Sequence, residues 1–151
     1  MLELNLVNVS KERLPTKSCL FGKLSKIFKS LKERKTVSVS LVFVSRLEMR
    51  RLNMVWRKRD KPTTILTFCD LKEGIKLPLK AKDKYVHLGD IFLCPSEIRK
   101  RSKLNKETYL SFLDKLLIHG VLHLYGYAHG NTKSALNMEN KEKQILKHLA
   151  G

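Results

Sequence analysis

The chain has 151 residues and carries 31 Lys plus Arg against 14 Asp plus Glu, which gives a formal net charge of +17. Hydrophobic residues make up 42% of it, enough to bury the core of one domain, and no polar low-complexity tract indicates disorder. No apolar run reaches the roughly 18 residues of a membrane span, and the first ten residues lack the basic segment of a secretory signal. These features predict a single domain, residues 1–151, in the cytoplasm.

The charge and the cysteines narrow the class of protein further. Cys19, Cys69 and Cys94 form no C-x-x-C pair, so the sequence favours reduced thiols over a disulfide framework or a thiolate zinc site. A strongly positive field attracts polyanions, and nucleic acid is the abundant polyanion of the cytoplasm. The charge therefore predicts a nucleic-acid partner, although lysines that only solvate the surface are the alternative.

The first half of the chain alternates between strand and helix patterns. Residues 2–9 and 36–45 are alternating or β-branched, which predicts two strands. In residues 16–35 apolar side chains recur three and four positions apart, and residues 47–56 return to that spacing, so both segments are predicted to be helices. Pro62 ends the second of these helices, and a third strand is predicted over residues 63–68.

The second half contains one more strand and then only helices. Residues 70–84 hold Gly74, Pro78 and five lysines and are predicted to form a loop or loose hairpin. A strand is predicted over 85–93, followed by helices over 95–102, 107–125 and 132–149. This order predicts an α+β fold in which a small mixed sheet of about four strands packs against about five helices.

Three of the five histidines, His119, His123 and His129, lie in one short stretch. On a helix, His119 and His123 project from one face and can bind one cation together. Gly126 can adopt the left-handed conformation that ends a helix, so that the chain turns back and His129 joins them. Three neutral imidazoles leave a fourth position open, which is typical of catalytic zinc. We therefore expect one divalent metal, Zn²⁺, on this helix and the loop after it.

The same spacing matches the metzincin protease pattern H-E-x-x-H-x-x-G-x-x-H except at one place. Gly120 stands where the pattern has the glutamate that acts as general base in peptide hydrolysis. The pattern therefore predicts a metal site without the protease's base, with buried core histidines as the alternative. His87 and His148 have no partner in spacing and are expected to be satisfied or surface histidines.

The stretch from His119 to His129 resembles the H-G-x-L-H-L-x-G-Y-D-H signature of the YbeY endoribonucleases, which are bacterial rRNA maturation factors. Other segments are similar to further blocks of that family: Leu52-Asn53, Trp56-Arg57, Asp60, Pro62-Thr63, Leu66, Phe68, Leu88-Gly89-Asp90-Ile91, Met138 and residues 142–146. The resemblance implies a metal held by His119, His123 and His129, with Arg57 as the functional arginine near it. Four positions depart from the family pattern: Thr64, Thr67, Cys69 and Ala128, the last in place of an aspartate.

The resemblance also implies an activity. It indicates a metal-dependent endoribonuclease specific for single strands that matures the 3′ end of 16S rRNA and acts in ribosome quality control. RNA and the small ribosomal subunit or its maturation factors are the implied partners, with no membrane partner and no DNA specificity. Arg57 would hold the scissile phosphate through two hydrogen bonds.

Two basic segments flank the predicted site and could follow an RNA backbone without reading its bases. The candidate RNA-binding residues in them are Arg50, Arg51, Lys58, Arg59, Arg99 and Arg101. Two alternatives to the endoribonuclease stay open. One is a metzincin-like metalloprotease, and the other is a non-catalytic ribosome- or RNA-binding protein with a structural metal, which Ala128 keeps possible.

Overall fold

The computed structural model describes residues 1–70, 85–128 and 130–150. The predicted order of elements is confirmed there: β1 (Leu2–Asn8), α1 (Lys17–Ser30), β2 (Thr36–Phe43), α2 (Arg46–Arg57), β3 (Ile65–Cys69), β4 (Tyr85–Leu93), α3 (Pro95–Leu104), α4 (Tyr109–Leu124) and α5 (Thr132–Ala150). The loop predicted over residues 70–84 lies, apart from Asp70, outside the described residues. None of the helices in the described ranges is long and apolar enough to cross a membrane.

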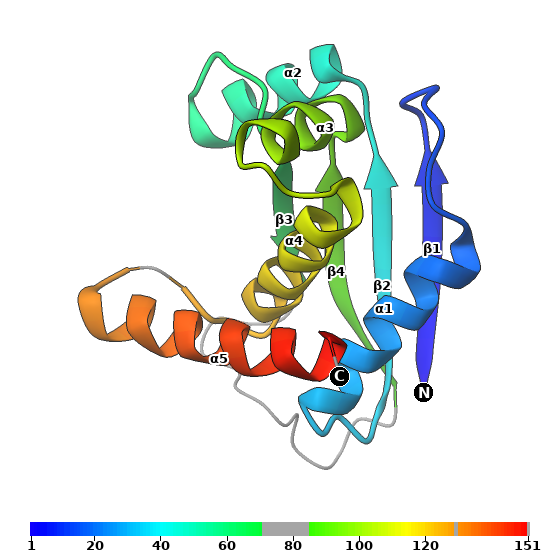
Figure 1. The fold of residues 1–151 in the computed structure, drawn as a ribbon, viewed down its shortest axis with the longest axis vertical. Helices are drawn as coiled ribbons and strands as arrows, with labels where there is room; N and C mark the ends of the chain where they lie inside the picture. Colours follow the sequence, from blue (N-terminus) through cyan, green and yellow to red (C-terminus); the bar gives the residue numbers. More distant parts are fainter. Residues whose placement is uncertain (71–84, 129, 151) are drawn as a thin grey trace.

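The four strands form one mixed sheet in the order β1-β2-β4-β3 (Figure 1). β1 pairs with β2 and β2 with β4 in parallel, whereas β3 runs antiparallel to β4. A parallel neighbour requires a crossover connection, and α1 provides it between β1 and β2. The α+β fold with a small mixed sheet is therefore confirmed.

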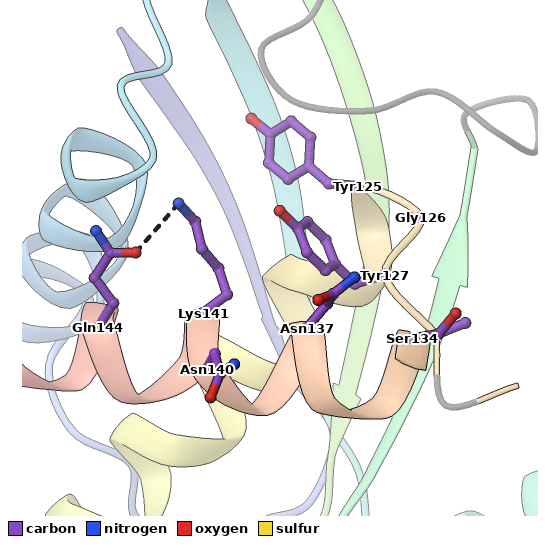
Figure 2. Close-up of a pocket in the computed structure, with 9 residues that line it drawn as sticks. Tyr125, Gly126, Tyr127, Ser134, Asn137, Asn140, Lys141 and Gln144 are labelled. Atoms are coloured by element: carbon purple, nitrogen blue, oxygen red, sulfur yellow. Dashed lines mark hydrogen bonds between the residues drawn. The ribbon is translucent and has the colours of Figure 1, made fainter. Parts of the chain in front are cut away.

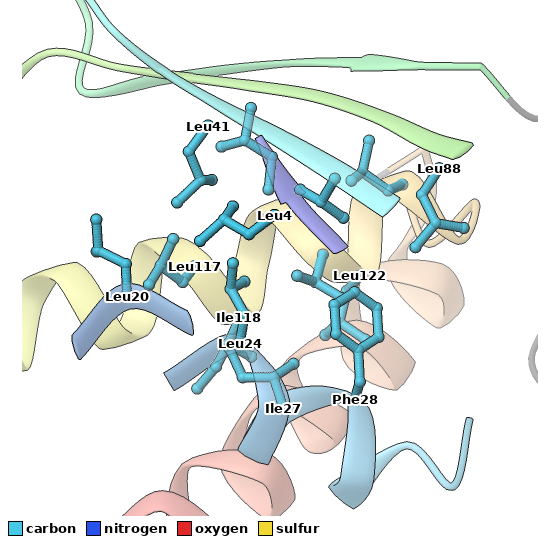
Figure 3. Close-up of a cluster of buried hydrophobic side chains, with 14 of the residues drawn as sticks. Leu4, Leu20, Leu24, Ile27, Phe28, Leu41, Leu88, Leu117, Ile118 and Leu122 are labelled. Carbon is cyan, nitrogen blue, oxygen red and sulfur yellow. The ribbon is translucent and has the colours of Figure 1, made fainter. Parts of the chain in front are cut away.

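The main core lies between one face of the sheet and helices α1, α4 and α5. Alternate residues of a strand point to the same face, so Leu4 of β1 and Leu41 of β2 both reach this core (Figure 3). There they meet Leu24 of α1 and Leu117 of α4, all of them almost fully buried. A smaller cluster is made of Val44, Met49, Leu66 and Cys94. It packs against strand side chains that point to the other face of the sheet, such as Phe92. Helix α4 belongs to the main core, where it packs on β3 and β4 and lies against α1, α3 and α5.

Helix α1 is shorter than predicted. It ends at Ser30, whereas the apolar spacing predicted a helix to about residue 35. Leu31 caps the helix, and Lys32 then adopts a left-handed backbone conformation with φ +58°. Glu33 donates its backbone N–H to the Phe28 carbonyl at 3.1 Å, so the chain reverses direction here before β2 begins.

Candidate metal centre

The histidine-bearing helix lies directly against the sheet at Gly120. A Cβ at this position would be 3.0 Å from Ile91 Cδ1 and 3.2 Å from Ile65 Cδ1, so no larger residue fits without displacing a neighbour. Because Gly120 faces the sheet, the two flanking histidine positions are turned to the side of the helix, where both rings are half-buried.

The structure brings His119 and His123 together. Their Nε2 atoms lie 3.0 Å apart, and the ring centroids are 4.4 Å apart with an angle of 78° between the ring planes. Two imidazoles bound to one tetrahedral zinc ion at about 2.0–2.1 Å have nitrogens roughly 3.3–3.4 Å apart, a few tenths of an ångström more than the separation here. The observed convergence of the two Nε2 atoms therefore fits a shared divalent cation.

A carboxylate from another helix orients the first of these rings. Glu142 of α5 places Oε1 3.2 Å from His119 Nδ1. In the tautomer in which Nδ1 donates to an ionised Glu142, the lone pair of His119 Nε2 is available to a metal. Sequence reasoning did not assign Glu142 a role. A signal was present, since Met138 and Ile145 are buried and Glu142 lies four and three positions from them, on the inward face of α5.

The third predicted ligand, His129, lies outside the described residues. The turn that leads to it is as predicted: Gly126 has φ +94° and donates its N–H to the His123 carbonyl at 3.0 Å. Within residues 1–70, 85–128 and 130–150, no three His, Cys, Asp or Glu side chains are grouped to hold a metal ion. The site as predicted thus combines two converging imidazoles with a ligand just beyond this turn.

Arg57 is the last residue of α2 and is exposed. The next residue, Lys58, ends the helix with φ +56°, and the chain then folds back on α2. Asn53 fixes this loop, because its side-chain Nδ2 donates to the Lys61 carbonyl at 2.8 Å and its backbone carbonyl accepts from the Arg59 N–H at 3.3 Å. The Arg57 guanidinium makes no hydrogen bond or ion pair with any described residue, the histidine pair included.

Comparison with known proteins decides the family. The model of the family described as Endoribonuclease YbeY matches residues 7–150. The chain belongs to the YbeY endoribonuclease family. Relatives carrying this name include one from Buchnera aphidicola, 31% identical over 99% of this chain and 92% of its own, and one from Thermotoga maritima, 32% identical over 86% and 85%. The resemblance stated above is therefore confirmed.

A solved structure shares the fold of this YbeY family member. A Thermotoga maritima protein known from a solution structure superposes with a TM-score of 0.65 at 27% identity. The match covers 99% of this chain and 89% of that chain.

The predicted RNA-binding residues of this YbeY family member fall into two groups. Three arginines form ion pairs within the protein: Arg50 with Asp60, Arg51 with Glu48, and Arg99 with Glu12. The pKa values of Asp60 and Glu48 are lowered, chiefly because their arginines donate hydrogen bonds to them. Lys58, Arg59 and Arg101 are exposed and form no ion pair with a described residue. The charges of the second group are not neutralised by an ion pair with any described residue.

The two remaining histidines have partners, as expected. His87 Nε2 lies 3.3 Å from Asp70 Oδ2 and 3.5 Å from Asp90 Oδ1, and its Nδ1 meets the hydroxyl of Ser38. His148 Nδ1 lies 3.1 Å from Ser30 Oγ. Neither residue belongs to the candidate metal centre.

Proposed function

We propose that this protein is a metal-dependent endoribonuclease that cleaves single-stranded RNA. The observation that carries the proposal is the convergence of His119 and His123, whose Nε2 atoms lie 3.0 Å apart, with Glu142 behind the first ring. Relatives of similar length are named endoribonucleases. A metal centre on a protein of net charge +17 suits a phosphodiester substrate better than a peptide.

The metal ligands in this proposal are His119, His123 and His129, with Zn²⁺ as the expected ion. When bound, a divalent ion stabilises negative charge on a phosphoryl oxygen. Glu142 positions the His119 ring and keeps its Nε2 deprotonated. Ala128 lies immediately before His129, where the family has an aspartate, so this chain has no carboxylate at that position to orient the third ligand.

Arg57 is proposed to stabilise the scissile phosphate. A guanidinium can donate two parallel hydrogen bonds to a phosphate, whereas an ammonium acts as a point charge. Arg57 forms no ion pair with a described residue, so the donors of its guanidinium are available for a ligand. Lys58, Arg59 and Arg101, together with the paired Arg50, Arg51 and Arg99, would follow the RNA backbone around the site.

Burial of Gly120 supports RNA cleavage over peptide cleavage. If a glutamate replaced Gly120, its Cβ would point toward Ile91 and Ile65 of the sheet. A general base at this position would be directed away from the two rings, so the metzincin mechanism has no base where its pattern requires one.

In the cell, the proposed substrate is the 3′ end of 16S rRNA. The proposal includes a role in ribosome quality control, a cytoplasmic location, and the small ribosomal subunit or its maturation factors as partners. The family resemblance and the excess of positive charge support these assignments.

The proposal is tested by single-turnover cleavage of a short unpaired RNA with and without a chelator. We expect cleavage that the chelator abolishes, and about one divalent metal per chain, lost in His123→Ala. Arg57→Lys should retain most RNA affinity but slow turnover on the order of a hundredfold. Arg59→Lys, two residues away, is the matched control and should be nearly silent. Equal losses from both changes would show that the segment acts only as a general basic patch.

A further inference from the structure

A cavity of about 470 Å³ lies between the turn after α4 and one face of α5. Tyr125 and Tyr127 form the wall on the side of the turn, and the helix contributes Asn137, Lys141 and Gln144 (Figure 2). These three helix positions are spaced four and three residues apart and therefore share one face. The volume lies within the range of about 300–1,000 Å³ that is usual for small-ligand pockets.

The chemistry of the lining is selective. Among the described residues that line it, none has a carboxylate side chain, and Lys141 supplies the only charge. The side-chain amides of Asn137 and Asn140 make no hydrogen bond with another described residue. Each amide offers both a donor and an acceptor, as do the exposed edges of unpaired nucleobases. The cavity therefore suits a flat, uncharged ring with mixed hydrogen-bonding edges that carries an anionic group.

The aromatic wall is held in place from behind. Tyr125 is almost fully buried, donates its hydroxyl to Glu33 Oε1 at 2.9 Å, and meets the edge of Phe28. Tyr127 is half-buried, packs against the core, and also lines the cavity. A ring supported in this way provides a stacking surface for a base of any identity.

The cavity adjoins the proposed ligands along the chain. Tyr127 follows His123 by four residues, so their Cα atoms are at most roughly 14 Å apart. The turn between them is closed by the hydrogen bond from Gly126 to the His123 carbonyl. A nucleotide bound in the cavity would therefore lie within a few nucleotides of a phosphate at the metal.

We propose that this cavity binds one unpaired base of the RNA strand. The base stacks on Tyr127, its edge meets the amides of Asn137 and Asn140, and its phosphate lies at the ammonium of Lys141. This inference rests on the proposed function, because it names the part of the substrate that is recognised. A base within a duplex has its edge and faces occupied and cannot enter, so the cavity would favour single strands.

The first test measures equilibrium binding of a short fluorescent unpaired RNA to the whole protein in excess chelator, which separates binding from cleavage. Tyr127→Ala should weaken binding roughly tenfold, the scale of one lost base–aromatic stack, whereas Tyr127→Phe should keep wild-type affinity. Tyr85→Ala changes an exposed tyrosine that does not line the cavity, and it should have little effect. Equal affinities of Tyr127→Ala and wild type would overturn the proposal.

A second pair of variants separates the cavity from general electrostatics. Lys141→Gln and Lys147→Gln remove the same charge from the same helix, but only Lys141 lines the cavity. We expect Lys141→Gln to weaken binding several-fold more than Lys147→Gln. Equal effects would show that both lysines act only through the overall field. Lys141 is partly exposed and Lys147 is exposed, so this comparison decides the question if Tyr127→Ala does not fold.

A third test uses the unmodified protein. RNA that contains 5-iodouridine should form a photocrosslink to Tyr127, and crosslinks found only in other peptides would refute the assignment. The proposed function and this inference fail separately. Crosslinking at Tyr127 without cleavage in the presence of metal would contradict the endoribonuclease and support the cavity. Metal-dependent cleavage with unchanged RNA affinity in the Tyr127 and Lys141 variants would support the endoribonuclease and contradict the role of the cavity.

Discussion

Gly89 is the position at which a single methyl group should do most damage to the fold. This residue of β4 has φ +144°, a conformation that residues with a side chain rarely adopt. A Cβ here would lie 2.1 Å from the carbonyl oxygen of Phe68 and 2.9 Å from Leu124 Cδ2. The first contact is with backbone, so it cannot be relieved by rotating a side chain.

The size of the effect follows from the strained backbone conformation and from the neighbours that a Cβ would displace. A strained φ costs about 1–3 kcal/mol, and displacing packed neighbours typically adds about 1–3 kcal/mol. Gly89 pairs with Cys69 of β3, so the displacement also opens the strand pair on which α4 rests. We expect Gly89→Ala to lower the free energy of unfolding by about 2–6 kcal/mol, out of the 5–15 kcal/mol of a typical domain. At about 2–4 °C per kcal/mol for a chain of this size, Tm should fall by roughly 4–24 °C.

The matched control is the same substitution in a helix. Gly22 lies inside α1, and a Cβ there would have no atom within 4 Å. Alanine is favoured over glycine in a helix by about 1 kcal/mol, so Gly22→Ala should raise Tm. Thermal and urea unfolding of both variants provide the measurement. A Gly89→Ala protein as stable as the wild type would refute the argument, as would equal losses from the two substitutions.

Three further substitutions test individual contacts. Glu142→Gln should weaken divalent-metal binding about 10–100-fold, because the charged acceptor behind His119 is lost, and unchanged affinity in a chelator competition would contradict this role. Burial, and after it the carboxylate of Glu33, raises the pKa of Tyr125. Its contribution to stability is therefore complete below the ordinary tyrosine pKa of about 10 and decreases above it. Tyr125→Phe should lack this alkaline loss in urea midpoints from pH 8 to 11, and parallel curves for both proteins would argue against it. Lys58→Gly should stabilise the protein by about 0.5–1 kcal/mol by relieving a left-handed lysine, so a lowered Tm would exclude that effect.

Local patterns were enough to predict the elements but not all their ends. Leu20, Leu24 and Ile27 are spaced for a helix, and all three are fully buried. The end of α1 was predicted wrongly because no Gly or Pro follows Ser30, and the left-handed residue there is Lys32. A lysine gives no sequence signal for that conformation, because its cost is offset by contacts made elsewhere in the fold.

In the candidate site too, contacts within one helix could be predicted from the sequence, whereas contacts between distant segments could not. Spacing of four residues predicted that His119 and His123 would converge, because helical geometry alone brings such side chains together. The contact from Glu142 joins residues 23 positions apart and depends on how α5 packs on α4. The ion pair between Arg50 and Asp60 likewise depends on the loop that Asn53 fixes. Such contacts have no period in the sequence, so tertiary structure was needed to find them.

The close approach of α4 to the sheet has a thermodynamic consequence. Gly120 and Leu124 both contact β3 or β4 directly, so the histidine helix cannot move away without exposing the core beneath it. The pair should therefore open only with global unfolding, and the amides of α4 should be among the slowest to exchange hydrogen. A ligand that binds only the native pair stabilises the whole protein, by about 2.7 kcal/mol at a hundred times its Kd. Thermal unfolding can thus rank candidate metals for this site without any activity assay.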